Sequence, residues 1–171
     1  RTLPKNKPSR KIIVTGGAMG IGRTTVKKLA ASGCEVTIGD IADAEGQSLA
    51  ESLQASGTKV HYVHADVTKM DDCQNLVEVA VDRMDGLDGL VNNAGITIAK
   101  STTELTEDDW ELALNLNLKS VWMCSKFAIP HLAKGSDPAI VNVSSTAGFV
   151  GFPGLAAYCA AKGGVIQLTK A

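Results

Sequence analysis

The sequence of 171 residues has few aromatic residues and no long hydrophobic run. Only 4% of its residues are Phe, Trp or Tyr. No apolar stretch approaches the roughly 20 residues of a membrane-spanning helix, and the first residues carry no signal-peptide pattern. These absences predict a cytoplasmic protein without a membrane partner.

Cysteine and histidine are scarce as well. The four cysteines are far apart and form no CxxC pair: Cys34, Cys73, Cys124 and Cys159. This pattern predicts buried free thiols in a reducing compartment. The three histidines lie on different expected elements, without the spacing of metal ligands: His61, His64 and His131. We therefore expect no metal site.

The net charge is also small, at −1, and gives no support to nucleic-acid binding. Several basic residues cluster at the start of the chain: Arg1, Lys5, Lys7 and Arg10. Together with Pro4 and Pro8 they predict a disordered basic tail over residues 1–10, followed by one domain over residues 11–171. Because the first residue is not methionine, we expect the chain to belong to a longer protein.

Glycine, by contrast, is abundant, with 17 residues, and short apolar runs alternate with longer helical patterns. Strands are expected at residues 11–15, 34–40, 59–65, 89–92 and 139–143. Helices are expected from the first glycine-rich turn to about residue 31, and then at about 42–55, 71–84, 106–132 and 155–171. This alternation predicts an α/β fold with a doubly wound parallel sheet.

The segment TGGAMGIG, at residues 15–22, stands between an expected strand and an expected helix. Gly16, Gly20 and Gly22 allow the backbone to turn tightly and to approach a diphosphate, whose charge the start of the helix attracts. The spacing differs from GxGxxG, and a plain glycine-rich turn is the alternative.

Asp40 ends the second expected strand, 18 residues after Gly22. An acidic residue about 20 residues beyond the glycine turn hydrogen-bonds the adenine ribose and repels a 2′-phosphate. Met19 and Ile41 flank these positions and offer no cation for such a phosphate. The pattern predicts NAD(H) rather than NADP(H), and a structural turn residue is the alternative for Asp40.

Tyr158 and Lys162 share one face of the last expected helix, since they are four residues apart. An ammonium beside a phenol favours the phenolate, which can lower the ordinary tyrosine pKa of about 10 into a range useful for proton transfer. Ser145 adds a hydroxyl upstream. Taken alone, such a pair is more often two surface neighbours.

In order and in spacing, the motifs TGGAMGIG, Asp66-Val67, Asn92-Asn93-Ala94-Gly95 and Tyr158-x-x-x-Lys162 resemble the short-chain dehydrogenase/reductase family. The resemblance extends from Lys11 to Ala171 and implies a Rossmann fold that is C-terminally incomplete, without the family's last strands and substrate loop. It implies that NAD is held by a set of residues along the chain: Gly16, Met19, Gly20, Ile21, Gly22, Asp40, Ile41, Asp66, Val67, Asn93, Ala94, Gly95, Tyr158 and Lys162.

The same resemblance implies four catalytic residues: Asn117, Ser145, Tyr158 and Lys162. Tyr158 is then the proton donor and acceptor, Lys162 binds the nicotinamide ribose and lowers the tyrosine pKa, and Ser145 positions the substrate oxygen. Asn117 holds a water that links Lys162 to solvent. Family spacing favours Asn117 over Asn115, and it favours Ser145, 13 residues before Tyr158, over Ser144.

The resemblance therefore implies an oxidoreductase that transfers a hydride between NAD(H) and a small-molecule secondary alcohol or ketone. The alternative is a truncated, inactive dinucleotide-binding or interaction module, because the substrate loop is missing. A homodimer or homotetramer is also implied, formed through the long helix at about 106–132 and the helix of Tyr158.

Overall fold

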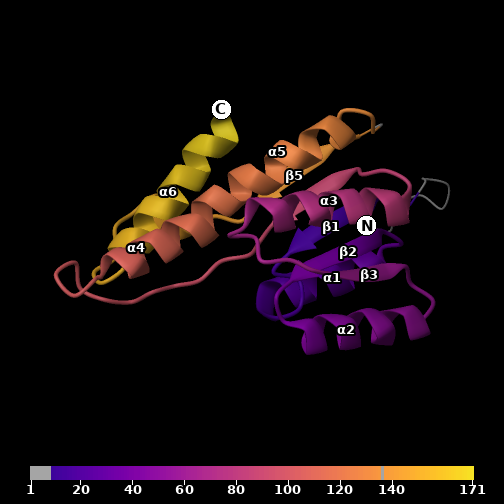
Figure 1. Ribbon diagram of the computed structural model, residues 1–171, viewed down its shortest axis with the longest axis horizontal. Coiled ribbons are helices and arrows are strands. Elements are labelled where there is room, and N and C mark those ends of the chain that lie inside the picture. Colours follow the sequence, from indigo (N-terminus) through magenta and orange to yellow (C-terminus); the bar gives the residue numbers. More distant parts are fainter. Residues whose placement is uncertain (1–8, 136) are drawn as a thin grey trace.

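A computed structural model describes residues 9–135 and 137–171, and it contains a five-stranded parallel sheet flanked by helices (Figure 1). The strands are β1 (Lys11–Thr15), β2 (Glu35–Asp40), β3 (Val60–His64), β4 (Gly89–Asn92) and β5 (Ala139–Asn142). The α-helices are α1 (Gly20–Ala31), α2 (Asp43–Ala55), α3 (Met70–Met84), α4 (Glu107–Leu114), α5 (Ser120–Leu132) and α6 (Ala156–Lys170). Each predicted strand is present within one residue of its expected ends.

The strand order is β3-β2-β1-β4-β5, with every neighbouring pair parallel. The chain thus builds outward from β1 to β3 and then returns to the other side of β1, which confirms the predicted doubly wound sheet. In such sheets, ligands bind beyond the carboxyl ends of the strands where the order reverses, which here is between β1 and β4.

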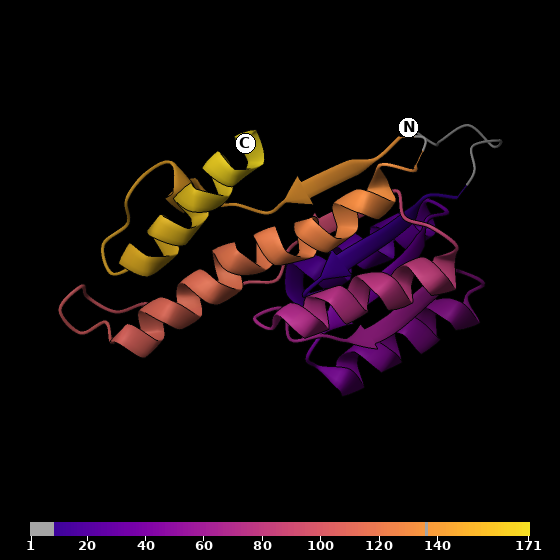
Figure 2. The ribbon, with the colours of Figure 1, turned by 45° about the horizontal axis from the view of Figure 1, so that its top comes forward.

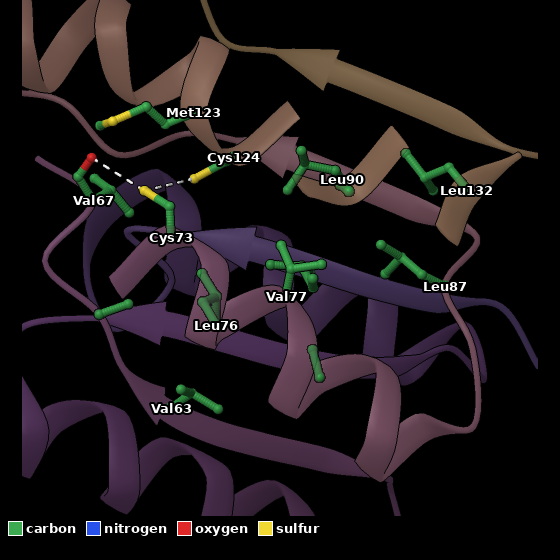
Figure 3. Close-up of a cluster of buried hydrophobic side chains, with 14 of the residues drawn as sticks. Val63, Val67, Cys73, Leu76, Val77, Leu87, Leu90, Met123, Cys124 and Leu132 are labelled. Carbon is green, nitrogen blue, oxygen red and sulfur yellow. Dashed lines mark hydrogen bonds between the residues drawn. The ribbon is translucent and has the colours of Figure 1, made fainter. Parts of the chain in front are cut away.

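Two apolar cores lie on opposite faces of the sheet. Ile12 and Val14 point to the face that α1 and α2 cover, whereas Ile13 and Leu90 point to the face that α3 and α5 cover. Figure 2 shows α3 beside α5, and Figure 3 shows the buried side chains between this helix pair and the sheet. Since successive strand residues point to opposite faces, a strand buried on both sides reads as a continuous apolar run.

The long helix expected at about 106–132 is interrupted. A π-helix, η1 (Asn115–Lys119), joins α4 to α5. Asn117 Nδ2 donates to the carbonyl of Ala113 at 2.9 Å, and Ser120 Oγ donates to the carbonyl of Leu116 at 2.6 Å. In an α-helix these carbonyls accept backbone N–H groups four residues later, so the side-chain donors compete for them and favour the wider turn.

Helix α4 begins with a capping box formed by Thr106 and Asp109. Asp109 N–H donates to Thr106 Oγ1 at 3.2 Å, and Thr106 N–H donates to the Asp109 carboxylate at 3.1 Å. Lys100 Nζ donates to the same carboxylate at 2.5 Å. These bonds lower the pKa of Asp109 to about 2, with the Lys100 hydrogen bond as the largest cause.

The predicted basic tail lies mostly outside the described residues. Of its members, Ser9 and Arg10 are described, and both make hydrogen bonds: Ser9 Oγ donates to Gly33 O at 2.6 Å, and Arg10 Nη2 donates to Asp137 O at 2.6 Å. Within residues 9–135 and 137–171, no helix has the length and apolar character needed to cross a bilayer.

Candidate functional site

The glycine-rich turn after β1 is closed by direct backbone packing. Gly16 and Gly20 have φ values of +62° and +54°, in the left-handed region that favours glycine. A Cβ at Gly22 would lie 2.0 Å from the Gly16 carbonyl oxygen, so α1 can approach the turn only without a side chain there. A Cβ at Gly20 would meet no atom of the described residues within 4 Å, so the turn is open at that point.

The start of α1 suits an anion. The first turn of the helix contains no acidic residue, and Met19, which precedes it, provides no side-chain cap. The first N–H groups of a helix have no partner within the helix and carry a partial positive charge. This turn can therefore hold a diphosphate.

The segment after β4 supports the same turn. Thr15 Oγ1 accepts the N–H groups of Asn93 at 3.0 Å and Ala94 at 3.2 Å. Asn93 Nδ2 donates to the carbonyls of Thr15 and Gly16, both at 3.0 Å. The predicted Asn93–Ala94 pair is thus bonded to the glycine-rich turn across the switch point of the sheet.

Asp40 is nearly buried at the end of β2, and its carboxylate accepts the N–H groups of Ala18 at 2.9 Å and Ala42 at 3.1 Å. These bonds give Asp40 the structural turn role that was the alternative interpretation. They leave free lone pairs on the carboxylate, since each oxygen can accept two hydrogen bonds. Ile41 follows Asp40 in sequence, Met19 follows Ala18, and the side chains of both Met19 and Ile41 are exposed.

Asp66 and Val67 follow β3 at the same edge of the sheet. Asp66 Oδ1 accepts both Thr68 Oγ1, at 2.7 Å, and Thr68 N–H, at 3.1 Å. The Thr68 hydroxyl is the main cause of a lowered pKa at Asp66, and Lys69, at 3.3 Å from its carboxylate, adds to it. The Asp66 carboxylate is therefore ionised and held by its own loop.

Lys162 is a buried cation, with 4% of its surface exposed. Its Nζ donates to the Val143 carbonyl at 2.8 Å and lies 5.7 Å from the centre of the Tyr158 ring. Burial lowers the pKa of Lys162, because desolvation disfavours the charged form. The structure thus brings together the phenol and the ammonium that the sequence singled out.

Asn117 Oδ1 and the Lys162 ammonium both lie close to the Gly95 backbone. A Cβ at Gly95 would lie 2.6 Å from Asn117 Oδ1 and 3.6 Å from Lys162 Nζ. Asn117 is fully buried, and it donates to Ile96 O at 2.9 Å and accepts from Ile96 N–H at 3.1 Å. Asn115, the competing residue, instead lines an open surface depression with other α4–α5 and α6 residues.

Ser145 and Ser144 have different contacts in the connection after β5. Ser145 Oγ accepts Ala147 N–H at 3.1 Å and so caps the short 3-10 helix η2 (Thr146–Gly148). Ser144 Oγ donates to Lys162 O at 2.9 Å and ties this connection to α6. Both hydroxyls thus lie on the segment that packs against the helix of Tyr158 and Lys162.

The family model for short chain dehydrogenases matches residues 10–171. The chain belongs to this oxidoreductase family. That membership confirms the resemblance inferred from the motifs, and it agrees with the doubly wound sheet and the glycine-rich turn.

Curated relatives of this chain are named for two different activities. A cyclopentanol dehydrogenase from Comamonas sp. (strain NCIMB 9872) is 38% identical over 160 residues, which cover 94% of this chain and 64% of that protein. A 3-oxoacyl-acyl-carrier-protein reductase from Thermotoga maritima is 38% identical over 158 residues, which cover 92% of this chain and 64% of that protein. The chain thus spans somewhat less than two thirds of the length of these relatives.

Solved short-chain dehydrogenase structures share the whole described architecture. A member from Burkholderia phymatum, in complex with NAD, superimposes with a TM-score of 0.92 and 27% identity, covering 95% of this chain and 58% of that one. A member from Mycobacterium smegmatis has a TM-score of 0.90 and 30% identity, covering 94% of this chain and 68% of that one.

Two supporting residues of the site were not predicted from the sequence. Thr15 stands inside the quoted glycine motif, and its position at a strand end is a signal for its bonds to Asn93 and Ala94. Tyr62 donates through its hydroxyl to Asp40 O at 2.8 Å. That contact depends on the pairing of β2 with β3, which no local sequence pattern reveals.

Proposed function

We propose that this chain binds NAD(H) and transfers a hydride between it and a secondary alcohol or ketone. The observation that carries the proposal is the buried Lys162 ammonium beside the Tyr158 ring, fixed by the Val143 carbonyl. A buried charge is costly unless it is paired and hydrogen-bonded, and this ammonium has the Val143 carbonyl as an acceptor. Membership of an oxidoreductase family supports the same reading.

The cofactor would be held by the edge of the sheet described above. The diphosphate fits the turn of Gly16, Met19, Gly20, Ile21 and Gly22, and the adenosine fits beside Asp40, Ile41, Asp66 and Val67. The nicotinamide half fits beside Asn93, Ala94, Gly95, Tyr158 and Lys162. When bound, NAD⁺ accepts a hydride from the substrate carbon and NADH returns one.

Asp40 favours NAD(H) over NADP(H). Its carboxylate brings negative charge to the end of β2, and the exposed neighbours Met19 and Ile41 supply no cation for a 2′-phosphate. The Burkholderia phymatum structure that resembles this chain contains NAD, which supports the same choice.

The chemistry of the chain's own residues follows from their contacts. Lys162 places its ammonium 5.7 Å from the centre of the Tyr158 ring, and Tyr158 takes or gives the proton of the substrate oxygen. Ser145 offers a hydroxyl donor for that oxygen, where charge changes during the reaction.

Asn117 acts in this proposal mainly by shaping the site. Both hydrogens of its Nδ2 are used, for Ile96 O and Ala113 O, and its Oδ1 accepts Ile96 N–H. A linking water can therefore reach the Asn117 side chain only through the second lone pair of Oδ1. The bonds to Ile96 hold the Gly95 backbone against Lys162.

The substrate is proposed to be modestly apolar. Phe149, Val150 and Phe152 follow η2, and their side chains are 78%, 57% and 44% exposed. These apolar side chains suit a cyclic or linear apolar alcohol as substrate, and a cyclopentanol dehydrogenase among the relatives supports that class. The 3-oxoacyl reductases among the relatives make a 3-oxoacyl thioester the second candidate.

A homodimer or homotetramer remains part of the proposal. Trp110, Leu112 and Trp122 are each about two-fifths exposed on α4 and α5. Aromatic side chains are enriched at interfaces between protein subunits, which supports a partner on this side of the molecule. Sedimentation velocity on the purified protein checks this, and a monomer across the micromolar range would contradict it.

The function is tested by titrating the protein with NADH and NADPH by fluorescence and then assaying NAD⁺ reduction with cyclopentanol, cyclohexanol and 2-butanol. The reverse reaction is assayed with NADH, cyclopentanone and a 3-oxobutanoyl thioester. We expect tighter binding of NADH and turnover of at least one pair. A preference for NADPH would contradict the role of Asp40, and binding without turnover would favour the inactive module.

A further inference from the structure

Two cysteines that are far apart in the sequence touch inside the core. Cys73 lies in the first turn of α3 and Cys124 in α5, and their sulfurs are 3.6 Å apart (Figure 3). Both are free thiols with almost no exposed surface. The close-up shows them at the edge of the apolar cluster nearest Val67, with Leu76 and Met123 as neighbours.

We propose that Cys73 and Cys124 are a site of reversible oxidation, which closes to an internal disulfide when hydrogen peroxide reacts with the pair. A disulfide has sulfurs about 2.05 Å apart, so each sulfur must move by less than about 1 Å. Because the two helices already pack against each other, no change of fold is needed.

The two thiols are not equivalent. The Cys124 S–H donates to the Cys73 sulfur, which stabilises a Cys73 thiolate and lowers the pKa of Cys73, while burial acts in the opposite direction. The same hydrogen bond, together with burial, raises the pKa of Cys124. Cys73 is therefore the sulfur that ionises first and attacks the oxidant.

The reaction balances with the peroxide alone. The Cys73 thiolate attacks one peroxide oxygen, the O–O bond breaks, and a sulfenic acid forms with release of hydroxide. The Cys124 sulfur then attacks Cys73, the S–O bond breaks, and the leaving hydroxide takes up the Cys124 proton as water. The two sulfurs lose two electrons, and one peroxide becomes two waters.

A small oxidant can reach this pair through the end of α3. Cys73 lies in the first turn of that helix, and Lys69, which precedes it, gives no side-chain cap. Helix ends without caps open locally more easily than the rest of a fold. A bulky disulfide such as oxidised glutathione needs a much larger opening than hydrogen peroxide does.

Oxidation would alter the loop that we assign to the adenosine. Cys73 donates its S–H to the Val67 carbonyl at 3.4 Å, and Asp72, the residue before it, accepts the Asp66 N–H at 2.9 Å. A disulfide has no S–H, so Val67 loses one of the two bonds by which α3 holds residues 66–67. Losing such a bond weakens NADH binding by roughly two- to ten-fold.

The test is a cysteine map of the purified protein. The protein is treated with hydrogen peroxide, and catalase then removes the peroxide. The protein is denatured in the presence of iodoacetamide, which alkylates free thiols, and digested with trypsin. We expect peptides 70–83 and 120–126 to be joined through Cys73 and Cys124, and to separate after dithiothreitol. The proposal would be overturned if Cys73 and Cys124 were both alkylated at peroxide levels that modify Cys159. It would also be overturned if Cys73 were found as an unpaired sulfinic acid.

Two variants make the result specific. C34A removes a buried cysteine outside the pair and should leave the joined peptides unchanged. C124A removes the partner and should leave Cys73 without a disulfide at the same peroxide dose.

The cofactor readout rests on the proposed function, whereas the cysteine map does not. Failure of the reduced protein to bind NADH would therefore count against the proposed function alone. If the reduced protein binds NADH, the oxidised protein should bind it more weakly and recover with dithiothreitol. An equal affinity of the two forms would refute the link between this pair and the 66–67 loop.

Discussion

The close approach of Gly22 to the Gly16 backbone can be tested by substitution. In Gly22→Ala, the new Cβ would lie 2.0 Å from the Gly16 carbonyl oxygen and 2.6 Å from Asn93 Nδ2. Carbon and oxygen atoms in contact normally stand more than about 3 Å apart, so the start of α1 or the turn must move by about 1 Å. The obstacle is main chain, which cannot rotate away as a flexible side chain can.

The overlap in Gly22→Ala should lower the stability of the fold. Inserting a methyl group into a site that cannot yield costs about 3 kcal/mol. For a chain of this length, each kcal/mol lowers Tm by roughly 2–4 °C, so Gly22→Ala should lower Tm by roughly 6–12 °C. Displacing the turn should also weaken NADH binding, because the turn and the start of α1 are its proposed diphosphate site.

Gly20→Ala is the matched control. Its Cβ would meet nothing within 4 Å, but its φ of +54° is strained for alanine. That strain costs about 1 kcal/mol, which corresponds to a fall in Tm of roughly 2–4 °C. Thermal unfolding by circular dichroism measures both variants, and a Gly22→Ala protein no less stable than Gly20→Ala would refute the steric argument.

Two further predictions concern stability. Thr37 is fully buried and its hydroxyl has no hydrogen-bond partner among residues 9–135 and 137–171, so Thr37→Val should raise Tm by roughly 2–4 °C in calorimetry, whereas a fall in Tm would show that the hydroxyl is satisfied. Asp109 has a pKa lowered from 3.8 to about 2 by Lys100 and Thr106, so its contribution is present above about pH 4 and is lost as the pH falls through 2. In urea titrations, Lys100→Met should therefore be less stable than the wild type at pH 6, with a much smaller difference near pH 2, and a difference as large at pH 2 as at pH 6 would contradict this assignment.

The sequence predicts the central strands well because β1 and β2 are buried on both faces, whereas β5 is partly exposed. Runs such as residues 12–15 and 36–38 are apolar or β-branched, and glycines follow them directly. The π-helix could not be predicted in this way. Asn117, whose side chain bonds to Ala113 at the π-helix, is also held by Ile96, a residue 21 positions away that only the folded chain brings near.

Part of the candidate site could also be predicted from the sequence. Tyr158 and Lys162 lie on one helix, so their spacing alone predicts their contact. The contact of Cys73 with Cys124 joins residues 51 positions apart, and it arises from the packing of α3 on α5. Scattered cysteines in a sequence therefore gave no sign of a pair in the core.

In the proposed reaction, the Tyr158 hydroxyl carries the proton that accompanies hydride transfer. Tyr158→Phe keeps the ring beside Lys162 and removes only the oxygen, so it separates chemistry from binding. The most direct measurement is kcat for this variant with the best alcohol of the panel, alongside its Kd for NADH. We predict a fall in kcat of about 10²- to 10⁴-fold, with the Kd changed by less than about two-fold. A variant that keeps the wild-type kcat would contradict the account.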